Sequence, residues 1–299
     1  MVGLKQYKQD PHWLLKTTIV RTVTFLPILA ACLYYFQPSI ETLALYSLPI
    51  LLLTLAGSWQ MFSGLALGAA IATYDKGFAA TDLLWILAGL LVTFPTSSIM
   101  HSAAHGSYRP RFLNRFLGEV MGFWHNLSID IWAVVHFYHH KHTDIPNLDP
   151  HPALGHTYMG FLDASGKSFG AAFTHHFFDC HGKGDKAMRA FQLTILNFKV
   201  RSPIVSLIWF LLLGPKAFVF FYGTNIVFKR YHYAWFNWAT HRKTGDEVQV
   251  LNLNHGIYKF VNLISWNLYY HGNHHLYPFL INPKNLPQQA KIKEKQPAA

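Results

Sequence analysis

Cysteine is nearly missing from this sequence: Cys32 and Cys180 are the only two among 299 residues. Two widely separated cysteines form no CxxC pair, so they provide neither a disulfide framework nor a rubredoxin-like or zinc-ribbon site. Histidine, by contrast, occurs 19 times. A metal site in this chain would therefore have to be built from histidine rather than from thiolate ligands.

Charged residues are also scarce, at 13% of the chain, whereas 51% of the residues are hydrophobic. Long stretches without charge are typical of integral membrane proteins rather than of soluble two-domain proteins, so a lipid bilayer is the first expected partner. The net charge is +11, but the basic residues do not form a stripe, and no nucleic acid is expected. They flank the apolar stretches, which is the distribution of basic residues in the cytoplasmic segments of membrane proteins and at anionic headgroups. These flanking residues include Lys5, Lys8, Lys16, Arg21, Arg109, Arg111 and Arg115.

The beginning of the chain is polar for about a dozen residues, and we expect no cleavable signal peptide. Residues 1–16 are predicted to lie at the membrane surface, with Trp13 as an anchor at the level of the headgroups. Residues 18–36 form a first apolar run, which Gln37-Pro38 ends.

Residues 42–74 contain no charged side chain. A helix of that length would exceed one crossing of a ~30 Å hydrocarbon core, so we expect it to divide near residues 57–60. Residues 83–100 form a further run that leads directly to His101. If the N-terminus and Arg109 are both cytoplasmic, an even number of crossings separates them. Four crossings satisfy this condition, and two do so if part of 42–74 is interfacial or re-entrant.

The chain after the first histidine cluster is predicted to form a cap, followed by a helical hairpin. Residues 116–135 resemble an amphipathic surface helix, and residues 141–200 contain no run long enough to cross, so residues 116–200 are predicted to form a cytoplasmic cap. Residues 202–238 fit a helical hairpin that turns at 214–216 and returns near His241. We therefore expect one membrane domain over residues 17–281 and a disordered tail over 282–299.

Three histidine clusters lie near the ends of apolar runs. On a helix, residues at i, i+3 and i+4 share a face, so each cluster presents its imidazoles in one direction. Neutral imidazole is a ligand for zinc, copper, iron and nickel. The clusters contain His101, His105, His136, His139, His140, His271, His274 and His275. Eight imidazoles exceed what one metal ion takes from a protein, which predicts two metals. A nitrogen-only pair suits redox iron and O₂ better than hydrolysis, although the ligand type does not exclude zinc.

Other polar residues near the clusters receive different predictions. His142 points away from the second cluster on a helical wheel, and His125 lies three turns from it, so neither is expected to bind the same metal. His151, His156, His175, His176 and His181 are predicted to be surface or cap-packing residues, and His255 stays undecided. Candidate acceptors for the outer ring N–H groups are Asp130, Asp144, Asp149, Asp246, Asn267 and Asn273.

The order and spacing of these motifs resemble the membrane-bound fatty acid desaturase family. Residues 101–105, 136–140 and 271–275 read His-x-x-x-His, His-x-x-His-His and His-x-x-His-His. The resemblance extends to His105-Gly106-Ser107, to Asn147-Leu148-Asp149-Pro150, and to residues 237–241, which read Asn-x-x-x-His. It covers about residues 85–280. Ser102 departs from it, because many members carry an acidic residue there.

The resemblance implies an all-α, multi-pass integral membrane enzyme with four to six transmembrane helices, whose cytoplasmic cap holds two iron ions. The implied ligands are the eight clustered histidines together with His241, and Asn237 would hold a metal-bound water. The family uses O₂ and an external electron donor, such as a ferredoxin or a b-type cytochrome, to place a double bond in a fatty acyl chain of a lipid or thioester. No His-Pro-Gly-Gly haem motif occurs, so a separate donor is expected. Aromatic candidates for a substrate channel are Trp124, Trp132, Phe137, Trp235, Trp238 and Trp266.

Four other functions are alternatives to desaturation. The same iron set could serve a lipid hydroxylase or a carotenoid ketolase, because substrate registry decides whether oxygen is inserted. A metal transporter would need its polar ligands near the bilayer midplane, whereas these histidines lie at the ends of the apolar segments. A purely structural zinc protein is the least expected of these functions.

Overall fold

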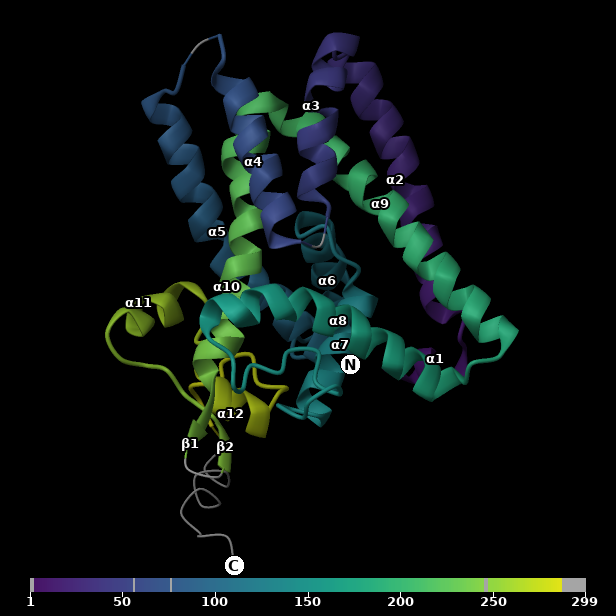
Figure 1. The fold of residues 1–299 in the computed structure, drawn as a ribbon, viewed down its shortest axis with the longest axis vertical. Coiled ribbons are helices and arrows are strands. Elements are labelled where there is room, and N and C mark those ends of the chain that lie inside the picture. The colour runs from purple at the N-terminus through teal and green to yellow at the C-terminus, as the bar shows by residue number, and fades with distance from the viewer. Residues whose placement is uncertain (1–2, 56, 76, 245–246, 287–299) are drawn as a thin grey trace, which may run out of the picture.

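The structure is a computed structural model that describes residues 3–55, 57–75, 77–244 and 247–286. The part of the predicted tail that follows residue 286 lies outside the described residues, as does Asp246. The chain is almost entirely helical, with the long helices in the upper part of Figure 1 and a layer of shorter helices below them. This arrangement confirms the predicted all-α membrane class.

Three helical stretches within the described residues are long and apolar enough to cross a membrane. They are α2 (Trp13–Phe36), α5 (Ala80–His105), and the combined stretch of α9 (Asp185–Ala217), the π-helix η1 (Phe218–Gly223) and α10 (Thr224–Thr240). The combined stretch breaks at Gly214, whose φ of 73° is left-handed. Figure 1 shows α9 rising and α10 descending from this break, which is the predicted hairpin. Within the described residues, α2, α5, α9 and α10 thus form four long arms, which we call the membrane arms.

The charge-free stretch after α2 divides as predicted. It forms α3 (Ile40–Leu53) and α4 (Ser58–Thr73), and Ser39 caps α3 by accepting a hydrogen bond from the Thr42 amide at 3.1 Å. With 14 and 16 residues, these helices span only about 21 and 24 Å. Each is therefore shorter than a ~30 Å hydrocarbon core. They form an antiparallel hairpin in the upper half of the molecule, which fits the re-entrant alternative (Figure 1).

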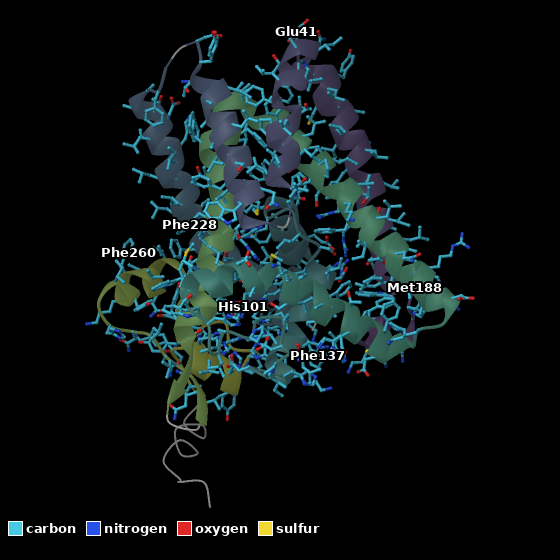
Figure 2. All side chains as sticks on the ribbon, in the orientation of Figure 1. Glu41, His101, Phe137, Met188, Phe228 and Phe260 are labelled. Carbon is cyan, nitrogen blue, oxygen red and sulfur yellow. The ribbon has the colours of Figure 1, made fainter. Side chains whose placement is uncertain are left out.

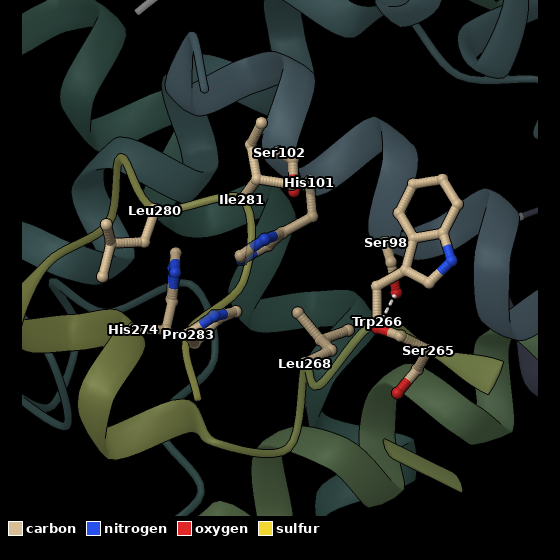
Figure 3. A pocket seen from close by; sticks show the side chains of 10 residues that line it. All are labelled: Ser98, His101, Ser102, Ser265, Trp266, Leu268, His274, Leu280, Ile281 and Pro283. Atoms are coloured by element: carbon tan, nitrogen blue, oxygen red, sulfur yellow. Dashed lines mark hydrogen bonds between the residues drawn. The ribbon is translucent and has the colours of Figure 1, made fainter. Parts of the chain in front are cut away.

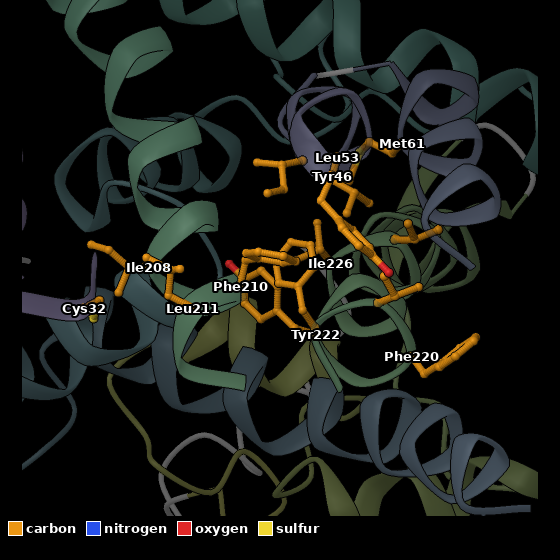
Figure 4. Close-up of a cluster of buried hydrophobic side chains, with 14 residues drawn as sticks. Cys32, Tyr46, Leu53, Met61, Ile208, Phe210, Leu211, Phe220, Tyr222 and Ile226 are labelled. Carbon is orange, nitrogen blue, oxygen red and sulfur yellow. The ribbon is translucent and has the colours of Figure 1, made fainter. Parts of the chain in front are cut away.

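The membrane part has its own core, shown in Figure 4. Tyr46 of α3 packs on Phe210 of α9 with ring centroids 5.0 Å apart. Close backbone approach requires a glycine at one point: a Cβ on Gly89 of α5 would lie 2.4 Å from the carbonyl oxygen of Phe221. Small residues at helix contacts allow packing of this kind in a bilayer.

The cap is built from α6 (Phe112–Trp124), α7 (Ile129–Lys141) and α8 (Tyr158–His181). Residues 116–135 are therefore not one helix, because the chain turns between Trp124 and Ile129. The predicted cap extends to residue 200, but α9 already begins at Asp185, so its first turns join the cap to the membrane arm. The short α1 (Leu4–Gln9) buries Tyr7 against this cap, and its predicted contact with the bilayer surface stays a prediction.

The C-terminal part completes the layer below the membrane arms. A two-stranded antiparallel hairpin, β1 (His241–Thr244) and β2 (Glu247–Val250), follows α10 directly. It is followed by α11 (Ile257–Ile264) and α12 (His271–Leu276). Figure 1 shows α12 beneath α10 and α11 to one side, near the lower end of α5.

Candidate metal centre

The histidines reach the centre from four elements. His101 and His105 occupy the last two turns of α5, which ends at the left-handed Gly106. His139 and its neighbours occupy the last turns of α7, and His241 stands where α10 becomes β1. The third cluster forms the short helix α12. All nine predicted ligands therefore meet at the boundary between the membrane arms and the cap.

The nine imidazoles form two groups. Within each group, one ring nitrogen from every histidine lies within 4.8 Å of the corresponding nitrogens of the others. The first group contains His101, His105, His136, His140 and His274, and the second contains His139, His241, His271 and His275. The groups adjoin, because the rings of His140 and His275 have centroids 4.3 Å apart. The side chains thus offer two neighbouring positions for metal ions.

The distances between ring nitrogens fit ligands that share an ion. Nε2 of His136 lies 2.8 Å from Nε2 of His105 and 3.1 Å from Nε2 of His140, and His271 and His275 show the same distance of 3.1 Å. Histidine ligands about 2.05 Å from an ion lie about 2.9–3.4 Å apart in octahedral or tetrahedral geometry. A single Nε2 has one lone pair or one N–H, so it cannot bond to two imidazoles at once. A shared cation accounts for this convergence.

Several of the converging nitrogens are otherwise unpartnered. Nε2 of His101, His139 and His241 is buried and has no hydrogen-bond partner among the described residues. A buried polar atom without a hydrogen-bond partner destabilises the folded protein, so we expect each of these atoms to have a partner. A metal ion between them would supply it, and the donor set therefore fits two nitrogen-liganded ions.

Two aspartates orient the second group. Nδ1 of His139 donates to Asp149 at 2.9 Å, and Nδ1 of His241 donates to Asp144 at 2.7 Å. This tautomer leaves each Nε2 lone pair free to bind metal, as carboxylate–histidine–metal triads do. Asp149 also accepts a hydrogen bond from the Asp144 amide at 2.6 Å, so one loop carries both orienting groups.

Burial keeps the imidazoles uncharged. It lowers the pKa of His140 to about 4, with a smaller contribution from His241, and it lowers the pKa values of His139, His271 and His274 well below the usual range. The neighbouring histidines add to this effect, because a second positive charge close by is unfavourable. The rings of these four histidines are therefore neutral near pH 7, and no proton has to leave them before a metal binds.

The third cluster depends on a glycine and on an asparagine pair. A Cβ on Gly272 would lie 2.5 Å from the carbonyl oxygen of Val250, so only glycine lets α12 approach β2 this closely. Asn252 and Asn273 form two hydrogen bonds: Nδ2 of Asn252 donates to Oδ1 of Asn273 at 2.8 Å, and the Asn273 amide donates to Oδ1 of Asn252 at 3.0 Å. Neither role was predicted from the sequence, although a glycine inside the third histidine cluster was a visible signal of close backbone contact.

Asn237 and the predicted outer acceptors have mixed outcomes. Asn237 lies one turn before His241, and its Nδ2 donates to the carbonyl oxygen of Tyr233 at 2.9 Å, so its role toward a metal-bound water stays a prediction. Asp130 pairs with Arg21 and Arg115 instead of with a histidine. Asn273 pairs with Asn252, as described above.

The remaining histidines lie outside the two groups, and the expectation that His125 and His142 bind no metal of this centre stays a prediction. His125 is buried near the Lys229 side chain, whose Nζ donates to its carbonyl oxygen at 2.6 Å. His176 packs within the cap and donates from Nε2 to the carbonyl oxygen of Leu148 at 3.2 Å. His151 was predicted to be a surface or cap-packing residue, and it lies beside the second group with its ring centroid 5.7 Å from that of His139.

A small cavity of about 10 Å³ adjoins the first group (Figure 3). It is lined by His101 and His274 together with Ser98, Ser102, Ser265, Trp266, Leu268, Leu280, Ile281 and Pro283. Trp266 was among the aromatic residues predicted to line a channel. Another of them, Trp132, stacks on His136 with ring centroids 4.6 Å apart. Trp132 thus contacts a predicted ligand, whereas Trp266 shares only the lining of the cavity with His101 and His274.

The family model for fatty acid desaturases matches residues 77–299, which is most of the chain. The chain belongs to the fatty acid desaturase family. This member of the family therefore has the enzyme class that its histidine motifs indicate, namely that of a membrane-bound oxidoreductase of the desaturase and hydroxylase type. Comparisons with curated proteins and with solved structures gave no match.

Proposed function

We propose that this desaturase holds two iron ions and uses O₂ to place a double bond in a fatty acyl chain of a lipid or thioester. The observation that carries the proposal is the convergence of nine imidazoles, most of them buried, into two adjoining groups without a thiolate. Such a set suits redox iron. When bound, the iron pair would supply O₂ activation. The overall reaction would consume O₂, two electrons from a separate donor such as a ferredoxin or b-type cytochrome, two protons and two substrate hydrogens. It would release two waters and leave a double bond in the acyl chain.

The two groups would hold one ion each. The first offers five imidazoles, and the second offers four, so the second has room for a further ligand. Asn237, one turn before His241 on α10, is proposed to hold a water molecule at that position. Asp144 and Asp149 keep His241 and His139 in the metal-binding tautomer.

Burial of the predicted ligands limits the access of water to the centre. His139 and His274 are each only 1% exposed, which keeps bulk water away from the reacting atoms. The small cavity at His101 lies on the same side of the centre as Trp266. An acyl chain that reached the first group from this side, after a movement of the lining side chains, would present its carbons to that group, so orientation is the main contribution of the protein.

The centre is proposed to face the cytoplasm. The N-terminal α1 packs on α7, so the beginning of the described chain and the histidines lie on the same side of the long helices (Figure 1). Arg109 and Arg111, on the loop after the first cluster, carry positive charge on that side. The distribution of basic residues in membrane proteins supports a cytoplasmic location for this face.

The proposal is tested by fatty-acid methyl ester profiling and metal analysis of cells that express the chain. We expect new unsaturation and about two irons per chain, and loss of product in His274→Ala and His139→Ala, one from each group. Both variants should stay in the membrane, whereas His142→Ala and His181→Ala should retain most of the product. Full activity in both group variants would refute the ligand assignment. New hydroxyl or keto groups would favour the hydroxylase or ketolase alternative.

A further inference from the structure

A larger cavity, of about 420 Å³, opens beside α11. Its volume falls in the range of ligand sites, about 300–1,000 Å³. It is lined by Lys259, Leu263, Trp266, Asn267, Ile281, Asn282 and Lys284. Trp266 and Ile281 also line the small cavity that reaches His101 and His274 (Figure 3). The two cavities therefore adjoin, and the small one borders the first histidine group.

Each side of this opening is held by an asparagine. Asn262 is buried, and its side chain donates to the carbonyl oxygen of Leu253 at 2.8 Å and accepts from the amide of Tyr269 at 3.1 Å. On the other side, Nδ2 of Asn273 donates to the carbonyl oxygen of Pro283 at 3.0 Å. These bonds attach α11 to Leu253 and Tyr269, and they attach Pro283 to α12.

Trp266 stands at the junction of the two cavities. It and Asn267 have φ values of 50° and 62°, in the left-handed region that a bulky side chain seldom adopts. Ser98 of α5 donates to the carbonyl oxygen of Ser265 at 2.7 Å, which ties this turn to the helix that carries His101. A cavity of about 10 Å³ holds about one water, so an acyl chain passes only if side chains such as Trp266 move.

The outer rim combines positive charge with exposed apolar side chains. Lys259 and Lys284 form no ion pair with a described carboxylate. On α11, Ile257, Phe260 and Leu263 are 68%, 51% and 75% exposed. They recur every three residues on a helix that packs against α5. Such a helix lies in the membrane surface with its apolar side in lipid.

From these observations we infer that the large cavity is the entrance for an acyl chain carried on a phosphate-bearing membrane lipid. Lys259 and Lys284 bind the phosphate, and the chain runs past Trp266 toward His101 and His274. Phosphate also occurs in coenzyme A thioesters, but the exposed apolar side of α11 favours a substrate that enters from the bilayer. The inference rests on the proposed function, because it names the substrate class for the same centre.

The test uses photo-crosslinking, whose readout does not require turnover. The full-length protein, in phosphatidylcholine vesicles, receives trace phosphatidylglycerol with a diazirine in its acyl chain, and labelled peptides are mapped by mass spectrometry. We expect labelling within residues 259–284. The double variant Lys259→Gln/Lys284→Gln should lose about tenfold to thirtyfold of it, because each lysine near an anionic group contributes to affinity.

The matched control is Lys183→Gln/Lys186→Gln. These exposed lysines precede Met188, which lies on the opposite side of the molecule from Phe260 (Figure 2). Their loss should leave the labelling unchanged. Equal labelling by a diazirine diacylglycerol, which has no phosphate, would overturn the inference. So would preferential labelling by a diazirine acyl-coenzyme A, or labelling that maps outside residues 259–284.

The variant His274→Ala separates the two proposals. If it loses product but keeps the lysine-dependent labelling, the entrance stands independently of the chemistry. If product forms in the unaltered protein while the double lysine variant labels normally, the entrance is wrong and the proposed desaturation stands.

Discussion

Nδ1 of His241 donates to Asp144 at 2.7 Å, and both side chains are buried. Asp144 has a left-handed backbone, with φ of 58°, which short polar side chains tolerate better than most. The loop after the second histidine cluster thus bends so that its carboxylate reaches a histidine 97 residues further along the chain.

This pair leads to the first prediction. In Asp144→Asn the amide could no longer favour the Nδ1–H tautomer of His241, so the affinity for metal should fall about 10- to 100-fold. Iron retained by the purified protein during a chelator titration measures this loss. The control is Asp163→Asn, which removes an exposed carboxylate on α8 and should retain iron like the unaltered protein. Equal retention in both variants would show that Asp144 does not orient a ligand.

The second prediction concerns the glycine of the third cluster. In Gly272→Ala the new methyl group would lie 2.5 Å from the carbonyl oxygen of Val250, so α12 has to move and its histidines with it. We expect loss of iron and of product. Gly170→Ala is the matched control, because a Cβ there meets nothing within 4 Å in the middle of α8. That change should leave iron binding intact and stabilise the helix by about 0.5–1 kcal/mol.

Much of the centre could be predicted because helical spacing makes histidine positions readable. Residues four apart share a helix face, so His101 and His105 had to point together, and the same holds for the second and third clusters. The split of residues 42–74 also followed from length alone. The family match then confirmed the enzyme class that these motifs indicated.

The division of the ligands into five and four could not be predicted. It depends on the rotation of each ring and on how α7 and α12 pack, which sequence spacing does not specify. His139 and His140 are neighbours in the chain but belong to different groups. The short lengths of α3 and α4 and the asparagine contacts of α11 likewise depend on tertiary packing, which helical spacing does not specify.

The third prediction concerns a buried charge that the sequence analysis had placed near the histidines. Asp130 is fully buried and pairs with Arg21 and Arg115. Breaking a buried pair leaves an uncompensated charge, so Asp130→Asn should destabilise the protein by about 3 kcal/mol. Asp10→Asn removes a partner from the exposed pair with Lys16 and should cost less than about 1 kcal/mol. Thermal unfolding of both variants in detergent measures the difference, and similar losses would contradict the prediction.

The last prediction concerns acid stability through His176. Burial lowers the pKa of its ring to about 4, an effect that the hydrogen bond to Leu148 partly opposes. The unfolded chain takes up this proton below about pH 6.5, whereas the folded protein does so only near pH 4. The unfolded state therefore binds more protons in this interval, so the contribution to stability is complete above pH 6.5 and is lost as the pH falls toward 4.

His176→Phe keeps an aromatic ring in the cap and removes the titration. The free energy of unfolding of the metal-free protein, measured by denaturant titration between pH 4 and 7.5, should then fall less steeply toward acid. The slope near pH 5 should decrease by up to about 1.4 kcal/mol per pH unit, the effect of one proton. Phe173→Leu alters packing in the same helix without removing a titratable group, so its curve should be shifted but parallel. A His176→Phe curve parallel to that of the unaltered protein would mean that this histidine does not stay neutral on folding.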